Sequence, residues 1–273
     1  MKPPRARVLA GLALAALAGA GVIPAPASPP ASVARVGPGA LRALYAPAPG
    51  VTEIALAAFL LDRRPVTNGE FLAFVTAHPD GLRWRRGTVP RLLAGDGYLA
   101  RWAGPLSLGP EVEADQPVTH VSWFAAKAYC ASQAKRLPTE MEWELAAAAG
   151  QRGPDGRAEE RFQERLLAAY NRPAPKTLAL VGRGPANYWG VHDLHGLVWE
   201  WVLDYNSTLV SSDSRGGKGA DRLPFCGVGG LAVGAKDDYA GFMRFAFRSA
   251  LEARYTTATL GFRCARDAPE PGR

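Results

Sequence analysis

Residues 190–204 read GVHDLHGLVWEWVLD, and the fold is most readily argued from this stretch. Residues 198–202 (VWEWV) predict a short strand with its two tryptophans, two positions apart, on one face. The loop before the strand holds Asp193 between His192 and His195. An H-x-x-H pair suits copper, zinc or iron(II), but no third ligand is apparent, so we do not expect a transition-metal site here.

Three helix starts lie upstream of this stretch. Thr67 with Glu70, and Thr139 with Glu142, form capping boxes, in which the hydroxyl and the carboxylate each bond a free backbone N–H. Ser122 is a further N-cap candidate. These signals predict helices from Thr67 to about Ala77, over 143–149, and over 123–134 with Phe124, Ala128 and Cys130 inward. Other short segments are expected at 162–170, and strands at 51–61 and 245–249, so loops and small strands should fill the second half.

The composition indicates a packed globular protein. Of the 273 residues, 48% are hydrophobic and 21% are charged, which excludes intrinsic disorder. The 30 glycines and 23 prolines make a coiled coil or long-helix bundle unlikely to form. Lysine and arginine exceed aspartate and glutamate by 32 to 25, but no segment concentrates the excess into a basic strip. We therefore expect no nucleic-acid partner.

Residues 1–27 have the order of a secretory signal peptide. Three cations within the first seven residues precede an apolar run over 8–23, and small residues follow up to Ala27. A transmembrane anchor is the alternative, but the run is short and interrupted by glycine. We expect a periplasmic or secreted protein that has no membrane contact once the signal is removed. A Pro/Ala-rich, mostly extended arm should follow over 28–50.

Five segments, in this order, carry a family resemblance: FLLDRRPVTNGEFLAFV (59–75), QPVTHVSWFAAKAYC (116–130), KRLPTEMEWELAAAA (135–149), GVHDLHGLVWEWVLD (190–204) and LGFRCARD (260–267). Together they resemble the sulfatase-modifying factor family, the group of the formylglycine-generating enzyme. The resemblance covers residues 51–267, leaving 268–273 as a tail. It implies a single α+β domain of C-type-lectin-like architecture, with short helices, small sheets and much loop.

The resemblance also shows what this chain lacks. The family's prototype oxidises a substrate cysteine to formylglycine with two cysteines that bind Cu(I), an ion for which thiolates are suitable ligands. Counted back from LGFRC, those positions fall at Ala235 and Ala240, and no cysteine occurs over 231–263. We therefore expect no copper at this site and no formylglycine generation by that mechanism. If chemistry remains, the candidate catalytic residues are Cys226 and Arg248, the latter matching an arginine that lines the prototype's cleft.

The chain has three cysteines, an odd number. Cys130 and Cys264 match positions that are disulfide-bonded in exported relatives, so the resemblance implies that they are joined. The alternative is two buried, reduced thiols. Cys226 is then the unpaired one, either inert and buried or used by the protein, because a lone thiol in an oxidising compartment needs protection or a role.

The resemblance further implies one structural calcium site, with the ligands Asp193, Gly196, Val198 and Glu200. Two carboxylates and two carbonyls suit this ion, which takes six to eight oxygens. The match is incomplete, because Leu197 replaces the family's usual asparagine and the prototype's second calcium loop is missing. The alternative is a plain strand whose tryptophans pack on one face.

Three functions remain open. The chain resembles exported family members without the cysteine pair that accompany copper nitrite reductases, which implies an accessory or maturation factor with an exported metalloenzyme as client. A periplasmic oxidoreductase, similar to the family branch that matures the pyoverdine chromophore, is the second. The third is a noncatalytic binding module.

Overall fold

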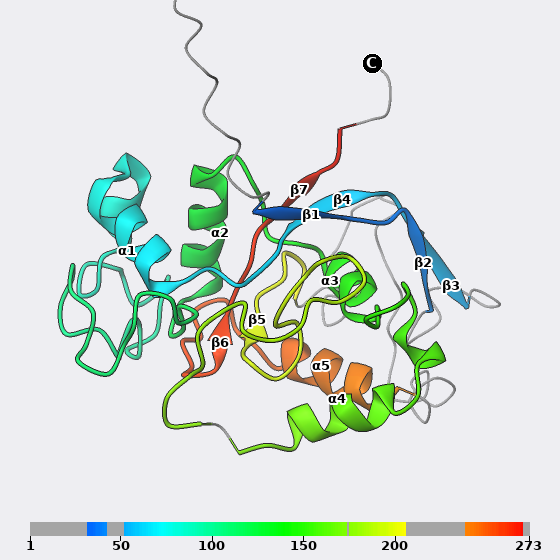
Figure 1. The fold of residues 1–273 in the computed structure, drawn as a ribbon. Helices are drawn as coiled ribbons and strands as arrows, with labels where there is room; N and C mark the ends of the chain where they lie inside the picture. Colours follow the sequence, from blue (N-terminus) through cyan, green and yellow to red (C-terminus); the bar gives the residue numbers. More distant parts are fainter. Residues whose placement is uncertain (1–31, 43–51, 174, 206–237, 270–273) are drawn as a thin grey trace, which may run out of the picture. The chain divides into compact units, whose positions relative to one another are not determined.

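A three-stranded antiparallel sheet of order β1–β4–β7 brings the first and last strands together. The computed structural model describes residues 32–42, 52–173, 175–205 and 238–269 (Figure 1). In the sheet, β4 (Phe59–Asp62) lies between β1 (Val33–Val36) and β7 (Ala265–Asp267). Phe59 and Leu61 on β4 are buried and their neighbours are half-buried, which is the two-residue period of a strand with one face in the core.

A second antiparallel ribbon consists of β2 (Gly39–Arg42) and β3 (Glu53–Leu56). The single strand expected over 51–61 is therefore wrong: β3 pairs with β2, whereas β4 pairs with β1. The arm expected over 28–50 is corrected as well, because both β1 and β2 lie in it. The folded unit begins at Ser32 rather than at residue 51. Pairing with β4 and β3, which a Pro/Ala-rich composition conceals, orders the described part of it, residues 33–42.

The three early helices begin where their caps predict. They are α1 (Asn68–Ala77), α2 (Trp123–Ser132) and α3 (Glu140–Ala147). Both capping boxes are complete, and the Ser122 side chain accepts a hydrogen bond from the backbone of α2. The inward face of α2 differs by one position from the expected one. Cys130 is buried as expected, but Phe124 and Ala128 are only partly buried. The buried stripe consists instead of Ala125, Ala126 and Tyr129, together with Cys130.

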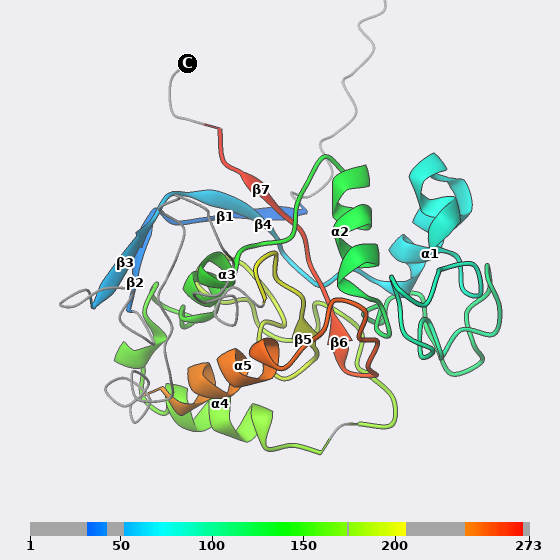
Figure 2. The ribbon, with the colours of Figure 1, turned by 180° about the vertical axis from the view of Figure 1, so that it is seen from behind.

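The second half of the chain contains more helix than expected. A short 3₁₀ helix, η2 (Gly156–Ala158), precedes α4 (Phe162–Tyr170) and α5 (Tyr239–Ser249), whereas a further 3₁₀ helix, η1 (Pro79–Trp84), follows α1 in the first half. The strand predicted over 245–249 is wrong, because this stretch is the last part of α5. Asp238 caps α5, and one face of the helix carries Arg244 and Arg248 into the protein. Helices α4 and α5 lie side by side (Figure 1 and Figure 2).

The core is rich in aromatic rings from distant segments. Phe71 of α1 stacks on Tyr129 of α2 with ring centroids 5.8 Å apart, and Phe262 meets both rings edge-on. Phe262 follows β6 (Leu260–Gly261), which pairs in parallel with β5 (Trp199–Glu200). Such offset and edge-to-face contacts add to the stabilisation from buried area. Among the described helices, none is long and apolar enough to cross a membrane.

Candidate functional site

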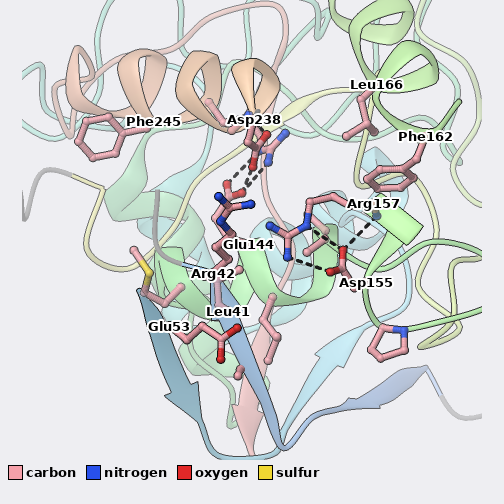
Figure 3. Close-up of a pocket in the computed structure, with 18 of the residues that line it drawn as sticks. Leu41, Arg42, Glu53, Glu144, Asp155, Arg157, Phe162, Leu166, Asp238 and Phe245 are labelled. Atoms are coloured by element: carbon pink, nitrogen blue, oxygen red, sulfur yellow. Dashed lines mark hydrogen bonds and ion pairs between the residues drawn. The ribbon is translucent and has the colours of Figure 1, made fainter. Parts of the chain in front are cut away.

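A cleft of about 140 Å³ lies between α3, α5, the start of α4 and the β2–β3 ribbon (Figure 3). In the view of Figure 3, α5 lies above the cleft and the two ribbon strands lie below it. Apolar side chains form much of the wall, among them Leu41, Leu145, Phe162, Leu166 and Phe245. Charged side chains from α3, α5, the β2–β3 ribbon and the η2 segment also line it. A partly apolar concave site with a few convergent charges is the usual form of a ligand pocket.

The charged end of the cleft is built by two helices that face each other. Glu140 and Glu144 lie one turn apart on α3, and Arg244 and Arg248 lie one turn apart on α5. Arg244 forms a bidentate pair with Glu144, donating through Nη2 at 2.6 Å and through Nε at 2.9 Å. Arg248 Nη1 donates to Glu144 at 2.7 Å and to Glu140 at 3.2 Å. The guanidinium carbon of Arg248 lies 4.4 Å from the centre of the Trp143 ring, a cation–π contact.

The two glutamates have opposite electrostatic situations. Burial by itself would raise the pKa of Glu144, but the positive charges of Arg244 and Arg248 outweigh it and lower that pKa to about 2. Burial raises the pKa of Glu140 to about 7, since the charge of Arg248 offsets only part of the desolvation and the neighbouring Glu144 opposes ionisation. Glu144 is therefore ionised throughout the neutral range and holds both arginines, whereas Glu140 changes its charge near neutral pH.

Two more carboxylates of the lining, Asp155 and Asp238, are held by local partners. Asp155 accepts hydrogen bonds from the Arg157 guanidinium at 2.8 and 2.9 Å, and these bonds lower the pKa of the Asp155 carboxyl. Asp238 accepts from the backbone N–H of Gly241 at 2.8 Å and so caps α5. Figure 3 shows the Asp155–Arg157 pair below Phe162 and Leu166. This side of the cleft is thus rigidly braced.

Glu200, one of the expected calcium ligands, is engaged by protein groups. Arg263 donates to both of its carboxylate oxygens at 2.7 Å, and the indole N–H of Trp143 donates at 2.7 Å. Both members of the Glu200–Arg263 pair are fully buried. Asp193 accepts from the backbone N–H of Gly182 at 2.5 Å. Because a guanidinium already neutralises Glu200, this carboxylate fits an arginine partner better than Ca²⁺, and calcium binding stays a prediction.

The histidines are likewise committed to the fold. His195 contacts Ala147 O through Nε2 at 2.9 Å and the Tyr170 hydroxyl through Nδ1 at 3.1 Å. Burial, together with the charge of Arg244, lowers the pKa of His195 to about 4. His192 Nδ1 lies 2.8 Å from Gly184 O. Within the described ranges, no group of three or more His, Cys, Asp or Glu side chains could hold a metal ion.

Residues singled out from the sequence fall in different places. Cys130 and Cys264 are joined by a disulfide, with their Cα atoms 5.5 Å apart. Ala240 is buried at the start of α5, in an apolar cluster with Phe162 and Leu166. Cys226 and Ala235 lie outside the described residues.

Arg248, a candidate catalytic residue, has its guanidinium held by two glutamates and its side chain is only 3% exposed, and its catalytic role stays a prediction. The sequence reasoning missed its partners Glu140 and Glu144, and Arg244 beside it. The spacing of these residues could have indicated them. Glu140 and Glu144 are four residues apart, as are Arg244 and Arg248, so on a helix each pair lies on one face.

Comparisons with known proteins agree with the sequence motifs. A model of the sulfatase-modifying factor enzyme 1-like domain matches residues 25–268. The formylglycine-generating enzyme of Streptomyces coelicolor is 31% identical over 265 residues, covering 81% of this chain and 83% of the relative. The protein named inactive C-alpha-formylglycine-generating enzyme 2 of Bos taurus is 29% identical over 254 residues, covering 81% of each chain.

Two further similarities are more limited. The serine/threonine-protein kinase pkn1 of Chlamydia caviae is 32% identical over 224 residues, which are 79% of this chain but only 34% of that relative. The solved structure of PvdO from Pseudomonas aeruginosa has a TM-score of 0.46 at 20% identity, covering 86% of this chain and 91% of that one. Since the domain model matches nearly the whole folded part, this chain belongs to the sulfatase-modifying factor enzyme 1-like family.

Proposed function

We propose that this chain is an accessory or maturation factor for an exported copper enzyme, and that it does not generate formylglycine through a two-cysteine Cu(I) site. The observation that carries the proposal is Ala240. Counted back from LGFRC, this residue falls at the family's second active-site cysteine, in a stretch, 231–263, that holds no cysteine, and it is buried in a cluster with Phe162 and Leu166. A methyl group supplies neither a ligand for Cu(I) nor a redox group.

Other features support the same proposal. The stretch 231–263 contains no cysteine, and the two cysteines among the described residues, Cys130 and Cys264, form a disulfide with each other. The residues present therefore do not fit a Cu(I) dithiolate. The cleft beside Ala240 offers carboxylates, guanidinium groups and apolar walls, which are groups for binding. A relative whose name calls it inactive indicates that the family includes members without the prototype's activity.

The first test is the prototype's own reaction. Copper-loaded protein is incubated with a peptide that carries a sulfatase-type cysteine, and mass spectrometry follows the loss of the thiol and the gain of the aldehyde. We expect no product above the level of a Cys226→Ala variant. Turnover that depends on Cys226 would mean that one thiolate suffices and would overturn this half of the proposal.

The second test addresses the client. Deleting the gene should lower the copper content and the activity of an exported copper enzyme of the same cell, and the wild-type gene should restore both. The same cells, fractionated, should contain the protein in the periplasm with its first residue near Ser28. Full copper loading of every exported copper enzyme in the deletion strain would refute the maturation role.

One observation favours a second candidate, an oxidoreductase that does not use cysteines. Glu140 lines the cleft with a pKa of about 7, which is suited to proton transfer at neutral pH. Oxygen uptake in the presence of a phenolic substrate, abolished in Glu140→Gln, would support this candidate. Without such uptake, the accessory role or a binding module remains.

A further inference from the structure

We infer that the cleft between α3, α5 and the β2–β3 ribbon is a binding site for an organic cation, a primary amine on a short hydrocarbon chain, whose charged head is received by Glu140. The site is argued from the cleft alone. It rests on the proposed function in one respect only: if the chain serves a client, the amine is a lysine side chain of that client.

The shape and the walls of the cleft suit such a group. A volume of about 140 Å³ is small and matches a short aliphatic chain. Phe162 and Leu166 of α4 line it from one helix and Phe245 of α5 from another (Figure 3). Apolar walls stabilise the hydrocarbon part of a ligand by removing it from water, while a buried carboxylate orients the polar end.

Glu140 is the acceptor because its hydrogen bonding is incomplete. Its side chain is 5% exposed and lines the cleft. Its Oε1 accepts one hydrogen bond, from Arg248 at 3.2 Å, whereas Oε2 receives none from the described residues and is not among the fully enclosed polar atoms without a partner, so it keeps some exposure. A mostly buried carboxylate with an open hydrogen-bonding position favours a charged donor. Glu144, by comparison, receives the bidentate Arg244 and a further bond from Arg248.

The charges around Glu140 also favour a cation. Five carboxylates line the cleft: Glu53 of β3, Glu140 and Glu144 of α3, Asp155 next to η2, and Asp238 at the start of α5. Three arginines line it, Arg42, Arg157 and Arg244, and Arg248 behind the wall makes four. Asp204 also faces Glu140, accepting a hydrogen bond from its backbone N–H at 2.7 Å, and burial raises the pKa of Asp204. With Glu140 ionised, the described residues that line the cleft therefore carry more negative than positive charge, five carboxylates to three arginines or four with Arg248, in a chain whose net charge is +7.

The protonation of Glu140 makes binding depend on pH. An amine stays protonated throughout the neutral range, so the change comes from the protein. Since Glu140 has a pKa of about 7, its ionised fraction rises about tenfold between pH 6 and pH 8. Cation affinity should rise about tenfold over the same interval and level off above it.

The experiment uses three probes of similar shape: n-pentylamine, n-pentanol and pentanoate. Binding to the full mature protein is followed by amide chemical shifts in NMR. We expect pentylamine to bind with a dissociation constant on the order of 1 mM at pH 8. Pentanol should bind at least tenfold more weakly and pentanoate not at all. Equal binding of pentylamine and pentanol, or no binding of pentylamine, would overturn the inference.

Two variants and one control locate the site. Glu140→Gln should lose at least tenfold in pentylamine affinity together with the pH dependence. Ala40→Trp, which fills the cleft from the exposed edge of β2, should abolish binding without touching the charged groups. Glu164→Gln, on the solvent side of α4, should bind like wild type. Unchanged affinity in Glu140→Gln, with thermal unfolding confirming that it is folded, would refute the role of Glu140.

A last pair of probes separates the sources of the amine. The peptide Ac-Ala-Ala-Lys-Ala-Ala-NH₂ should compete with pentylamine if the ligand is a protein side chain, and its Nε-acetylated form should not. If only pentylamine binds, the ligand is a free amine, and the cation site stands. These outcomes are independent of the copper content of a deletion strain, so the cation site and the maturation role can fail separately.

Discussion

Replacing Glu140 by glutamine should stabilise this protein above neutral pH, although the change removes half of a buried ion pair. The pKa of Glu140 is about 7 in the folded protein, against 4.5 for the unconstrained group. The folded state therefore holds a proton that the unfolded state releases, so the contribution of Glu140 to stability is complete below pH 4.5 and is lost as the pH rises through 7.

The magnitude follows from that difference. At about 1.4 kcal/mol for each pKa unit, the loss across this interval is about 3 kcal/mol. Glutamine has the shape of the protonated acid and stays neutral at every pH. The variant should thus equal wild type near pH 4 and exceed it by about 3 kcal/mol in free energy of unfolding near pH 8.

Urea denaturation of the two proteins at a series of pH values measures this difference directly. Groups that titrate in both proteins without interacting with Glu140, such as His195, cancel in the comparison. Glu144→Gln on the same helix is the matched control with the opposite expected sign. The pKa of Glu144 is about 2, so its contribution to stability is present above pH 4.5 and is lost as the pH falls. This variant should therefore lose about 3 kcal/mol in free energy of unfolding at neutral pH. If Glu140→Gln is less stable than wild type by the same amount at every pH, the pair with Arg248 is net stabilising and the reasoning fails.

Three further predictions concern the rest of the fold. Replacing Cys130 and Cys264 together by alanine should lower the stability by about 5 kcal/mol, the chain-entropy value for a loop of 134 residues, and denaturation in the presence and absence of a reductant measures it. If the expected structural calcium is bound, a chelator should lower the melting temperature of wild type but not of Asp193→Ala. Equal melting curves of wild type with and without the chelator would mean that Glu200 pairs with Arg263 and binds no calcium. Arg263→Met should lower the melting temperature strongly because it leaves the buried Glu200 carboxylate without its cation, and a Glu200→Gln/Arg263→Met double variant should recover part of that loss.

Local signals in the sequence predicted local structure well. The capping boxes at Thr67 and Thr139 and the cap at Ser122 each act within four residues of the chain, and all three helices begin there. The strands over 33–42 and the helix over 239–249 were missed for the opposite reason. β1 and β2 exist because β4 and β3 pair with them, and although Asp238 gives α5 a local cap, its arginine face is buried only through pairs with glutamates a hundred or more positions earlier.

The candidate site divides in the same way. The sequence by itself determined the family, through five motifs in order, and the lack of a cysteine pair, which is a matter of residue identity. Only the tertiary structure decided that Arg248 is held by glutamates rather than open to an anion, that Glu200 is paired with Arg263, and that Glu140 lines a cleft with one oxygen unbonded. The physical reason is that the charge state of a buried group depends on its desolvation and its partners, and both are set by segments that meet only when the chain folds.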